Sequence, residues 1–158
     1  MDTNDIPNKS ANTESTDTNG GKTRLIHGKT TNSILSAAYR VHSRLGPGLL
    51  ERPYRECLRY ELVRMGVKVE SEKILPVVYE GIRIEIGYRI DMLVDDAVIV
   101  EVKSVESILP VHEAQLLTYL RLDHKRVGLL LNFNVVRLRE GIRRRILGYE
   151  ELRGTPLK

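Results

Sequence analysis

Hydrophobic and polar residues alternate strictly along the middle of the chain, from Ile82 to Val94. Residues two apart in a strand point the same way, so this alternation predicts a strand that is buried on one face only. The apolar face is expected to hold the even-numbered residues Ile82, Ile84, Ile86, Tyr88, Ile90, Met92 and Val94. The opposite, polar face is expected to hold Arg83, Glu85, Arg89 and Asp91.

A second alternating run follows a turn at Asp95-Asp96, with Val98, Val100 and Val102 on one face and Glu101 and Lys103 on the other. The two apolar faces cover one core only if directly opposed residues have numbers with an even sum. A two-residue loop would break that rule, so we predict a three-residue loop or a bulge. With that register, Asp91, Glu101 and Lys103 converge on one side of the hairpin.

Such a cluster suits metal-assisted hydrolysis of a phosphodiester. Two carboxylates supply hard oxygen ligands for Mg²⁺, and a neighbouring ammonium can orient the attacking water or stabilise the transition state. The alternative is a salt bridge on a solvated sheet face, because Glu-x-Lys is a common spacing. The chain contains a similar pair, Asp123 and Lys125, at a predicted helix end with no strand around it.

The flanking sequence predicts helices on both sides of a meander. Caps at Thr30-Thr31-Asn32 begin a helix that ends at Gly46-Pro47, and a second helix is expected from Glu51 to Gly66. His42, near the end of the first helix, is interpreted as a packing or hydrogen-bonding residue. Glu51 fits the helix dipole on structural grounds alone, but Gly48 ahead of it could let the backbone approach a strand or ligand. A β-like stretch from 67 to 79 and a tight turn at Glu80-Gly81 lead into the central strand.

After Leu109-Pro110 a helix of about ten residues is expected, with His112, Gln115 and Tyr119 along one face. Residues 127–131 form a short apolar run that indicates a buried strand, parallel to the Glu101 strand if the helix is a crossover. The end of the domain is rich in arginine, including Arg143, Arg144 and Arg145. These arginines are either a phosphate-contacting patch or a solvated charged end.

Composition limits the classes of protein. A chain of 158 residues with 41% hydrophobic residues allows one domain, expected at 30–147 between a disordered polar tail at 1–29 and a short tail at 148–158. No apolar run resembles a signal peptide or membrane span, so a soluble, cytoplasmic protein without membrane partners is expected. The single cysteine, Cys57, excludes an internal disulfide and is interpreted as a core residue. The net charge is +4, and the acidic balance of the first 24 residues leaves the rest mildly basic.

The order of these motifs resembles the PD-(D/E)XK nuclease superfamily. An acid on the first long helices, Asp on one strand, Glu-x-Lys on the next and Gln-x-x-x-Tyr on the following helix fit its pattern. More closely, Gly48-Leu-Leu-Glu51-Arg-Pro-Tyr54 resembles the signature of the GxxExxY family. Tyr88-Arg89-Ile-Asp91, Glu101-Val-Lys103 and His112-Glu-Ala-Gln115-Leu-Leu-Thr-Tyr119 resemble that family's later motifs. Ile90 stands where the superfamily name has proline.

The resemblance implies an α/β fold with a restriction-endonuclease-like core: a mixed sheet of a three-strand meander, a crossover helix and a further strand, flanked by helices. It also implies that Asp91 and Glu101 bind Mg²⁺, that Lys103 is the active-site lysine, and that Glu51 completes or orients the metal site. Gln115 and Tyr119 would support the site or touch the nucleic-acid backbone.

Two functions follow as hypotheses. The first is a nuclease dependent on Mg²⁺, with Mn²⁺ as a substitute, that hydrolyses phosphodiester bonds in DNA. The second is a nuclease-fold module that binds nucleic acid or a protein without cutting. DNA is the expected partner, with RNA and a homodimer left open, and a clustered set of acids favours the first hypothesis because acids repel phosphate unless a metal lies between them.

Overall fold

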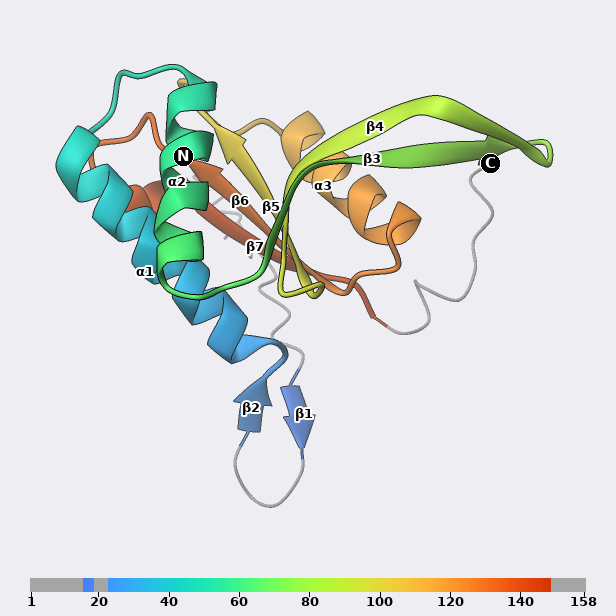
Figure 1. The fold of residues 1–158 in the computed structure, drawn as a ribbon, viewed down its shortest axis with the longest axis horizontal. Helices are drawn as coiled ribbons and strands as arrows, with labels where there is room; N and C mark the ends of the chain where they lie inside the picture. The colour runs from blue at the N-terminus through green and yellow to red at the C-terminus, as the bar shows by residue number, and fades with distance from the viewer. Residues whose placement is uncertain (1–15, 19–22, 149–158) are drawn as a thin grey trace, which may run out of the picture.

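The computed structural model describes residues 16–18 and 23–148, and the remaining parts of the predicted tails lie outside the described residues. A two-stranded antiparallel pair comes first, followed by two helices, three strands, a crossover helix and two more strands (Figure 1). The elements are β1 (Thr16–Thr18), β2 (Thr23–Leu25), α1 (Gly28–Leu45), α2 (Glu51–Arg64), β3 (Val69–Tyr79), β4 (Ile82–Val94), β5 (Val98–Lys103), α3 (Pro110–Leu122), β6 (Val127–Asn132), the 3-10 helix η1 (Leu138–Gly141) and β7 (Ile142–Ile146). Helix α1 thus begins at Gly28, two residues before the predicted start, and β2 lies within the stretch predicted as tail.

One mixed sheet has the strand order β3-β4-β5-β6-β7. Strands β3, β4 and β5 form the predicted antiparallel meander, and α3 carries the chain over to β6, which runs parallel to β5. The predicted α/β class and mixed sheet are confirmed. Strand β7 was not predicted: its arginines were interpreted as either a phosphate-contacting patch or a solvated charged end, yet Ile142–Ile146 pairs antiparallel with β6.

Helices cover both faces of the sheet (Figure 1). Apolar residues of α1 and α2 pack with Met92, Val100 and Leu129 on one face. On the other face, Leu116 and Leu120 of α3 pack with Leu93, Ile99 and Leu130. Because both faces are covered, the central strands β5 and β6 are buried almost throughout.

The predicted register between β4 and β5 is confirmed. Val94 pairs with Val98 across a loop of three residues, and Asp95 and Asp96 in that loop have φ angles of 51° and 52°. The predicted two-residue turn at Glu80-Gly81 is also present, with both residues at positive φ, as a tight hairpin between twisted strands requires.

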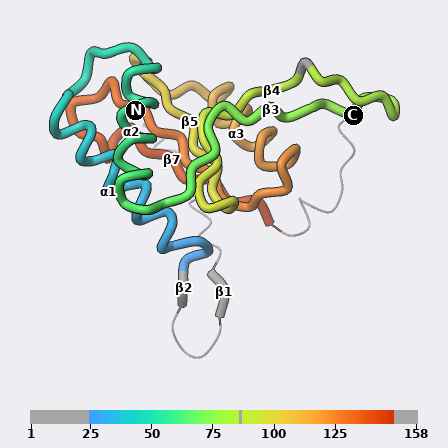
Figure 2. Tube along the Cα trace, viewed as in Figure 1, coloured from blue at the N-terminus to red at the C-terminus, as the bar shows by residue number. Residues whose placement is uncertain are grey.

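The first part of β4 departs from the prediction. Strand β5 pairs only with Met92–Val94, so β3 and the rest of β4 continue beyond the sheet as a two-stranded arm (Figures 1 and 2). On this arm Ile82 is 66% exposed, and Ile84 and Tyr88 are 41% and 42% exposed. The prediction that the whole even-numbered face is buried is therefore wrong for these residues, because no third strand or helix covers them.

Candidate active site

The acid pair lies where β4 and β5 separate. Backbone pairing reaches Met92 and Val100, and one step further along the same register Asp91 faces Glu101. Here the side chains continue the ladder: Asp91 N donates to Glu101 Oε1 at 3.0 Å, and Val102 N donates to Asp91 Oδ2 at 2.8 Å. Both residues are buried, with 8% and 4% exposure. The register therefore brings together two of the predicted site residues.

Burial and mutual repulsion mark Glu101 as the strained member of this pair. Burial, followed by the charge of Asp91, raises the pKa of Glu101 to about 8, against a smaller opposing effect of Lys103. Its Oε2 atom receives no hydrogen bond from the described residues. Two adjacent buried carboxylates supply the oxygen ligands that a hard divalent cation prefers, and such a cation would favour the ionised form of both.

Lys103 follows Glu101 on the same face of β5, two residues along the strand. Its Nζ atom donates to Gln115 Oε1 of α3 at 3.5 Å, a long hydrogen bond across the sheet-helix contact. The Lys103 charge opposes the rise in the pKa values of both Glu51 and Glu101. The hydrogen bond to Lys103 connects Gln115 of α3 to the strand that carries Glu101.

Glu51 begins α2, whose first turn lies beside the C-terminal end of β5 (Figure 1). Ser104, which follows Lys103, donates its hydroxyl to Leu49 O two residues before Glu51, so the start of α2 lies beside the end of β5. Burial raises the pKa of Glu51, with Lys103 opposing and Asp91 adding to the rise. Among the described residues, however, no group of three or more His, Cys, Asp or Glu side chains is arranged as a metal site. The chemistry of two acids and a lysine is present, with the helical acid close by.

The loop before α2 is held by Tyr54. Its hydroxyl donates to Gly46 O at 2.5 Å and accepts from Leu49 N at 3.1 Å, while its buried ring stacks on Phe133. Gly48 has a φ of 107°, and a Cβ there would meet no atom within 4 Å, so glycine is needed for the backbone angle and not for a close approach. Tyr54 therefore holds the loop that precedes Glu51, the first residue of α2.

Arg55 is the residue of this site that the sequence analysis missed. Its Nη1 atom donates to Asp91 Oδ1 at 3.1 Å, and its side chain is 13% exposed. Burial disfavours the charged guanidinium, but the hydrogen bond and charge of Asp91, with Glu72 and Glu56, outweigh it and raise the pKa of Arg55. A signal was available, because Arg55 follows Glu51 by four residues and so lies on the same side of α2.

The residues predicted to contact nucleic acid are not brought together. Tyr119 is only 3% exposed and its ring lies 5.3 Å from that of Tyr88, which favours a supporting role. Burial also raises its pKa. On β7, Arg143 and Arg145 form ion pairs with Glu113 of α3, whereas Arg144 donates to Ile26 O. Alternation along the strand thus divides the three arginines between two faces of the sheet.

Two other predicted residues have structural surroundings. His42 Nε2 lies 2.8 Å from the carbonyl oxygen of Val135, which agrees with its interpretation as a hydrogen-bonding residue. Cys57 is half-buried against the core and forms no disulfide. None of the helices in the described part of the chain combines the length and apolar character needed to span a bilayer.

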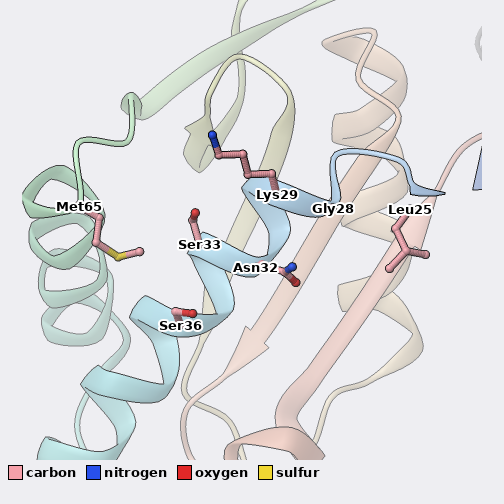
Figure 3. A pocket seen from close by; sticks show the side chains of 7 residues that line it. All are labelled: Leu25, Gly28, Lys29, Asn32, Ser33, Ser36 and Met65. Carbon is pink, nitrogen blue, oxygen red and sulfur yellow. The ribbon is translucent and has the colours of Figure 1, made fainter. Parts of the chain in front are cut away.

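A cavity of about 610 Å³ lies away from the acid cluster, where the first turn of α1 meets the end of α2 (Figure 3). Lys29, Ser33 and Met65 contribute to its walls, and its lining includes no acid. Met65 caps the C-terminal end of α2, one helix length away from Glu51. This cavity therefore offers no ligand set that could work with Asp91 and Glu101.

Comparison with known proteins gives one match. A family model described as the PD-(D/E)XK nuclease superfamily matches residues 28–145, from the start of α1 to the last strand of the sheet. No curated protein and no solved structure matches the chain.

Proposed function

Since the chain belongs to the PD-(D/E)XK nuclease superfamily, we propose that it is a metal-dependent nuclease that hydrolyses phosphodiester bonds in DNA. Within the superfamily we assign it to the GxxExxY family. The assignment is supported by Gly48 at positive φ in the loop before α2, by Glu51 at the start of that helix, and by Tyr54, which holds the loop through Gly46 and Leu49. The observation that carries the proposal is the buried, mutually hydrogen-bonded pair of Asp91 and Glu101 beside Lys103.

The donor set fits Mg²⁺, or Mn²⁺ in its place, held by Asp91 and Glu101 and completed or oriented by Glu51. A bound divalent ion would supply Lewis acidity and lower the pKa of a water molecule. Members of this superfamily typically use a divalent metal. The backbone N–H groups of Asp91 and Val102 fix one oxygen of each carboxylate. Of the other two oxygens, Glu101 Oε2 accepts no hydrogen bond from the described residues, whereas Asp91 Oδ1 accepts one from Arg55 Nη1.

Lys103 is proposed as the active-site lysine. Hydrolysis forms a bond from a water oxygen to phosphorus and breaks one bond from phosphorus to an ester oxygen, while negative charge grows on the phosphate oxygens. An ammonium held beside the acids can hydrogen-bond to the attacking water and offset that charge. Gln115 positions the ammonium through its Oε1 atom, and Tyr119 supports Gln115 from within the helix packing.

Cleavage of supercoiled plasmid in Mg²⁺, with EDTA as the blank, tests this proposal. We expect Asp91→Ala and Lys103→Ala each to lower the cleavage rate by about a thousandfold or more, because each removes a group needed at the reacting phosphate. Lys125→Ala is the matched control: Lys125 belongs to the Asp-x-Lys pair outside the site and bonds only exposed Asp96. Cleavage that survives in both site variants would contradict the assignment.

A module that binds without cutting is the second candidate, and the Arg55–Asp91 ion pair favours it because that pair balances Asp91 without a metal. Such a module would retain DNA in EDTA with an affinity that falls as salt rises. Replacement of Arg143, Arg144 and Arg145 together would then abolish retention. Retention in EDTA with no cleavage under any metal would establish this alternative and exclude the nuclease.

A further inference from the structure

Arg55 occupies the oxygen of Asp91 that faces away from the backbone. Asp91 Oδ2 accepts from Val102 N at 2.8 Å, so the remaining oxygen, Oδ1, is the one that Arg55 Nη1 contacts at 3.1 Å. A cation held between Asp91 and Glu101 would need that same oxygen, since the inner oxygens of both acids are engaged with N–H groups. The guanidinium and a divalent ion therefore compete for one ligand atom.

Carboxylates surround the Arg55 guanidinium, but they do not satisfy all of its hydrogen-bond donors. Its Nε atom is buried and has no hydrogen-bond partner among the described residues. Its Nη2 atom donates to Glu72 Oε1 at 3.3 Å, and Nε lies 3.8 Å from Glu56 Oε1. Two further acids thus surround Arg55, and both are about half exposed.

Glu72 reaches Arg55 through an unusual backbone. It has a φ of 55° in the middle of β3, a left-handed conformation that is uncommon for glutamate and is often found where a side chain must be re-aimed. The same carboxylate also lies 3.6 Å from Arg89 of β4. Ser71 pairs with Met92 and Lys73 pairs with Ile90, so Glu72 lies next to Asp91 on the neighbouring strand and offers Arg55 a second carboxylate.

We propose that Arg55 is the resident counter-ion of the acid site and that a divalent cation binds by displacing it from Asp91 toward Glu72. This inference rests on the proposed metal site but not on cleavage. Arginine stays protonated in proteins, so it cannot yield by losing a proton and must yield by moving. Glu72 and Glu56, which Arg55 already contacts, would receive it. Arg55 thus acts as a positioning residue that sets the affinity of the site for metal.

Binding of Mn²⁺ to the full chain tests the exchange, with free Mn²⁺ measured by its electron paramagnetic resonance signal. Arg55→Met is expected to bind Mn²⁺ at least tenfold more tightly than the unaltered protein, because the competing cation is gone. Asp91→Asn should lose binding. Arg64→Met is the matched control, since Arg64 lies in the last turn of α2 and pairs with Glu61 outside this network, and the affinity of this variant for Mn²⁺ should be unchanged.

Glu72→Gln keeps the test decisive if Arg55→Met fails to fold, because Glu72 is exposed and its removal leaves the buried pair intact. We expect it to weaken Mn²⁺ binding by threefold or more, since displaced Arg55 loses its acceptor. The inference would be overturned if the unaltered protein did not bind Mn²⁺, or if Arg55→Met bound it no more tightly than the unaltered protein. If Arg55→Met does not fold, unchanged Mn²⁺ binding by Glu72→Gln would overturn it. If the variants change Mn²⁺ affinity as expected but the protein does not cleave plasmid, only the proposed nuclease function is refuted. If the protein cleaves plasmid but Mn²⁺ affinity does not change, only this role of Arg55 is refuted.

Discussion

The two parts of β4 share one sequence pattern and have opposite surroundings. From Met92 to Val94 the strand pairs with both β3 and β5, and the residues from Ile90 to Val94 are all buried. The same alternation continues in the arm, where Ile82, Ile84 and Tyr88 are exposed. Alternation thus determines which residues share a face, whereas burial depends on whether another element covers that face. The candidate site lies at the boundary between the two parts, where Asp91 loses its backbone partner and gains Glu101.

The largest expected difference between the two parts is in how their acids make the free energy of unfolding depend on pH. Glu101 has a folded-state pKa of about 8, above its unfolded value, so the folded protein holds more protons between about pH 5 and pH 8. The free energy of unfolding without metal should therefore fall as pH rises through that range, by about 3 to 5 kcal/mol, since one pKa unit corresponds to about 1.4 kcal/mol.

Urea unfolding in EDTA at a series of pH values measures this effect. Glu101→Gln should remove most of the decline, whereas Glu85→Gln in the arm, where Glu85 is 68% exposed, should leave it intact. A flat profile in the unaltered protein would show that Glu101 is ionised when buried without metal.

The next difference is in apolar side chains. Leu93→Ala should lower the free energy of unfolding by about 2 to 4 kcal/mol, because Leu93 is 1% exposed and its removal leaves a cavity between the sheet and α3. Ile82→Ala should change it by less than about 0.5 kcal/mol, because Ile82 is 66% exposed at the end of the arm. Equal losses at the two sites, measured by urea unfolding, would mean that the arm is covered in solution.

The smallest difference concerns ion pairs. Arg83 and Glu85 of the arm lie 2.6 Å apart with side chains 63% and 68% exposed, so Arg83→Ala should alter the free energy of unfolding by less than about 0.5 kcal/mol. Arg55→Ala should cost more than 1 kcal/mol without metal, because it leaves Asp91 buried without its cation. Thermal unfolding in EDTA measures both, and an equal effect of the two substitutions would remove the distinction.

Much of the site could be predicted because the register of a hairpin follows from counting residues along its two alternating strands. The even sum of opposed positions predicts that Asp91 and Glu101 lie on one side of the hairpin, and the three-residue loop, one of the two ways to satisfy that rule, is present. The parallel pairing of β5 and β6 followed from the intervening helix. These features depend on local chain geometry, which the order of residues determines directly.

The parts that could not be predicted depend on distant neighbours. Nothing local shows that β5 ends its pairing at Met92, so the exposed arm was missed. Arg55 stands among other charged residues of α2, and only its contact with Asp91 distinguishes it from Arg52 or Arg59. The three arginines of β7 are adjacent in the chain, but their division between two faces required knowing that the segment pairs with β6.

The short connection between Asp91 and Glu101 has a consequence for how the protein folds. Only ten positions separate the two acids, so the hairpin that joins them closes a small loop at low entropic cost. Strand β6 and helix α2 must be brought from farther along the chain, and contacts of that kind form more slowly. The two carboxylates should therefore meet early, while water still solvates them, and the later arrival of the helices should enclose a pair that is already assembled.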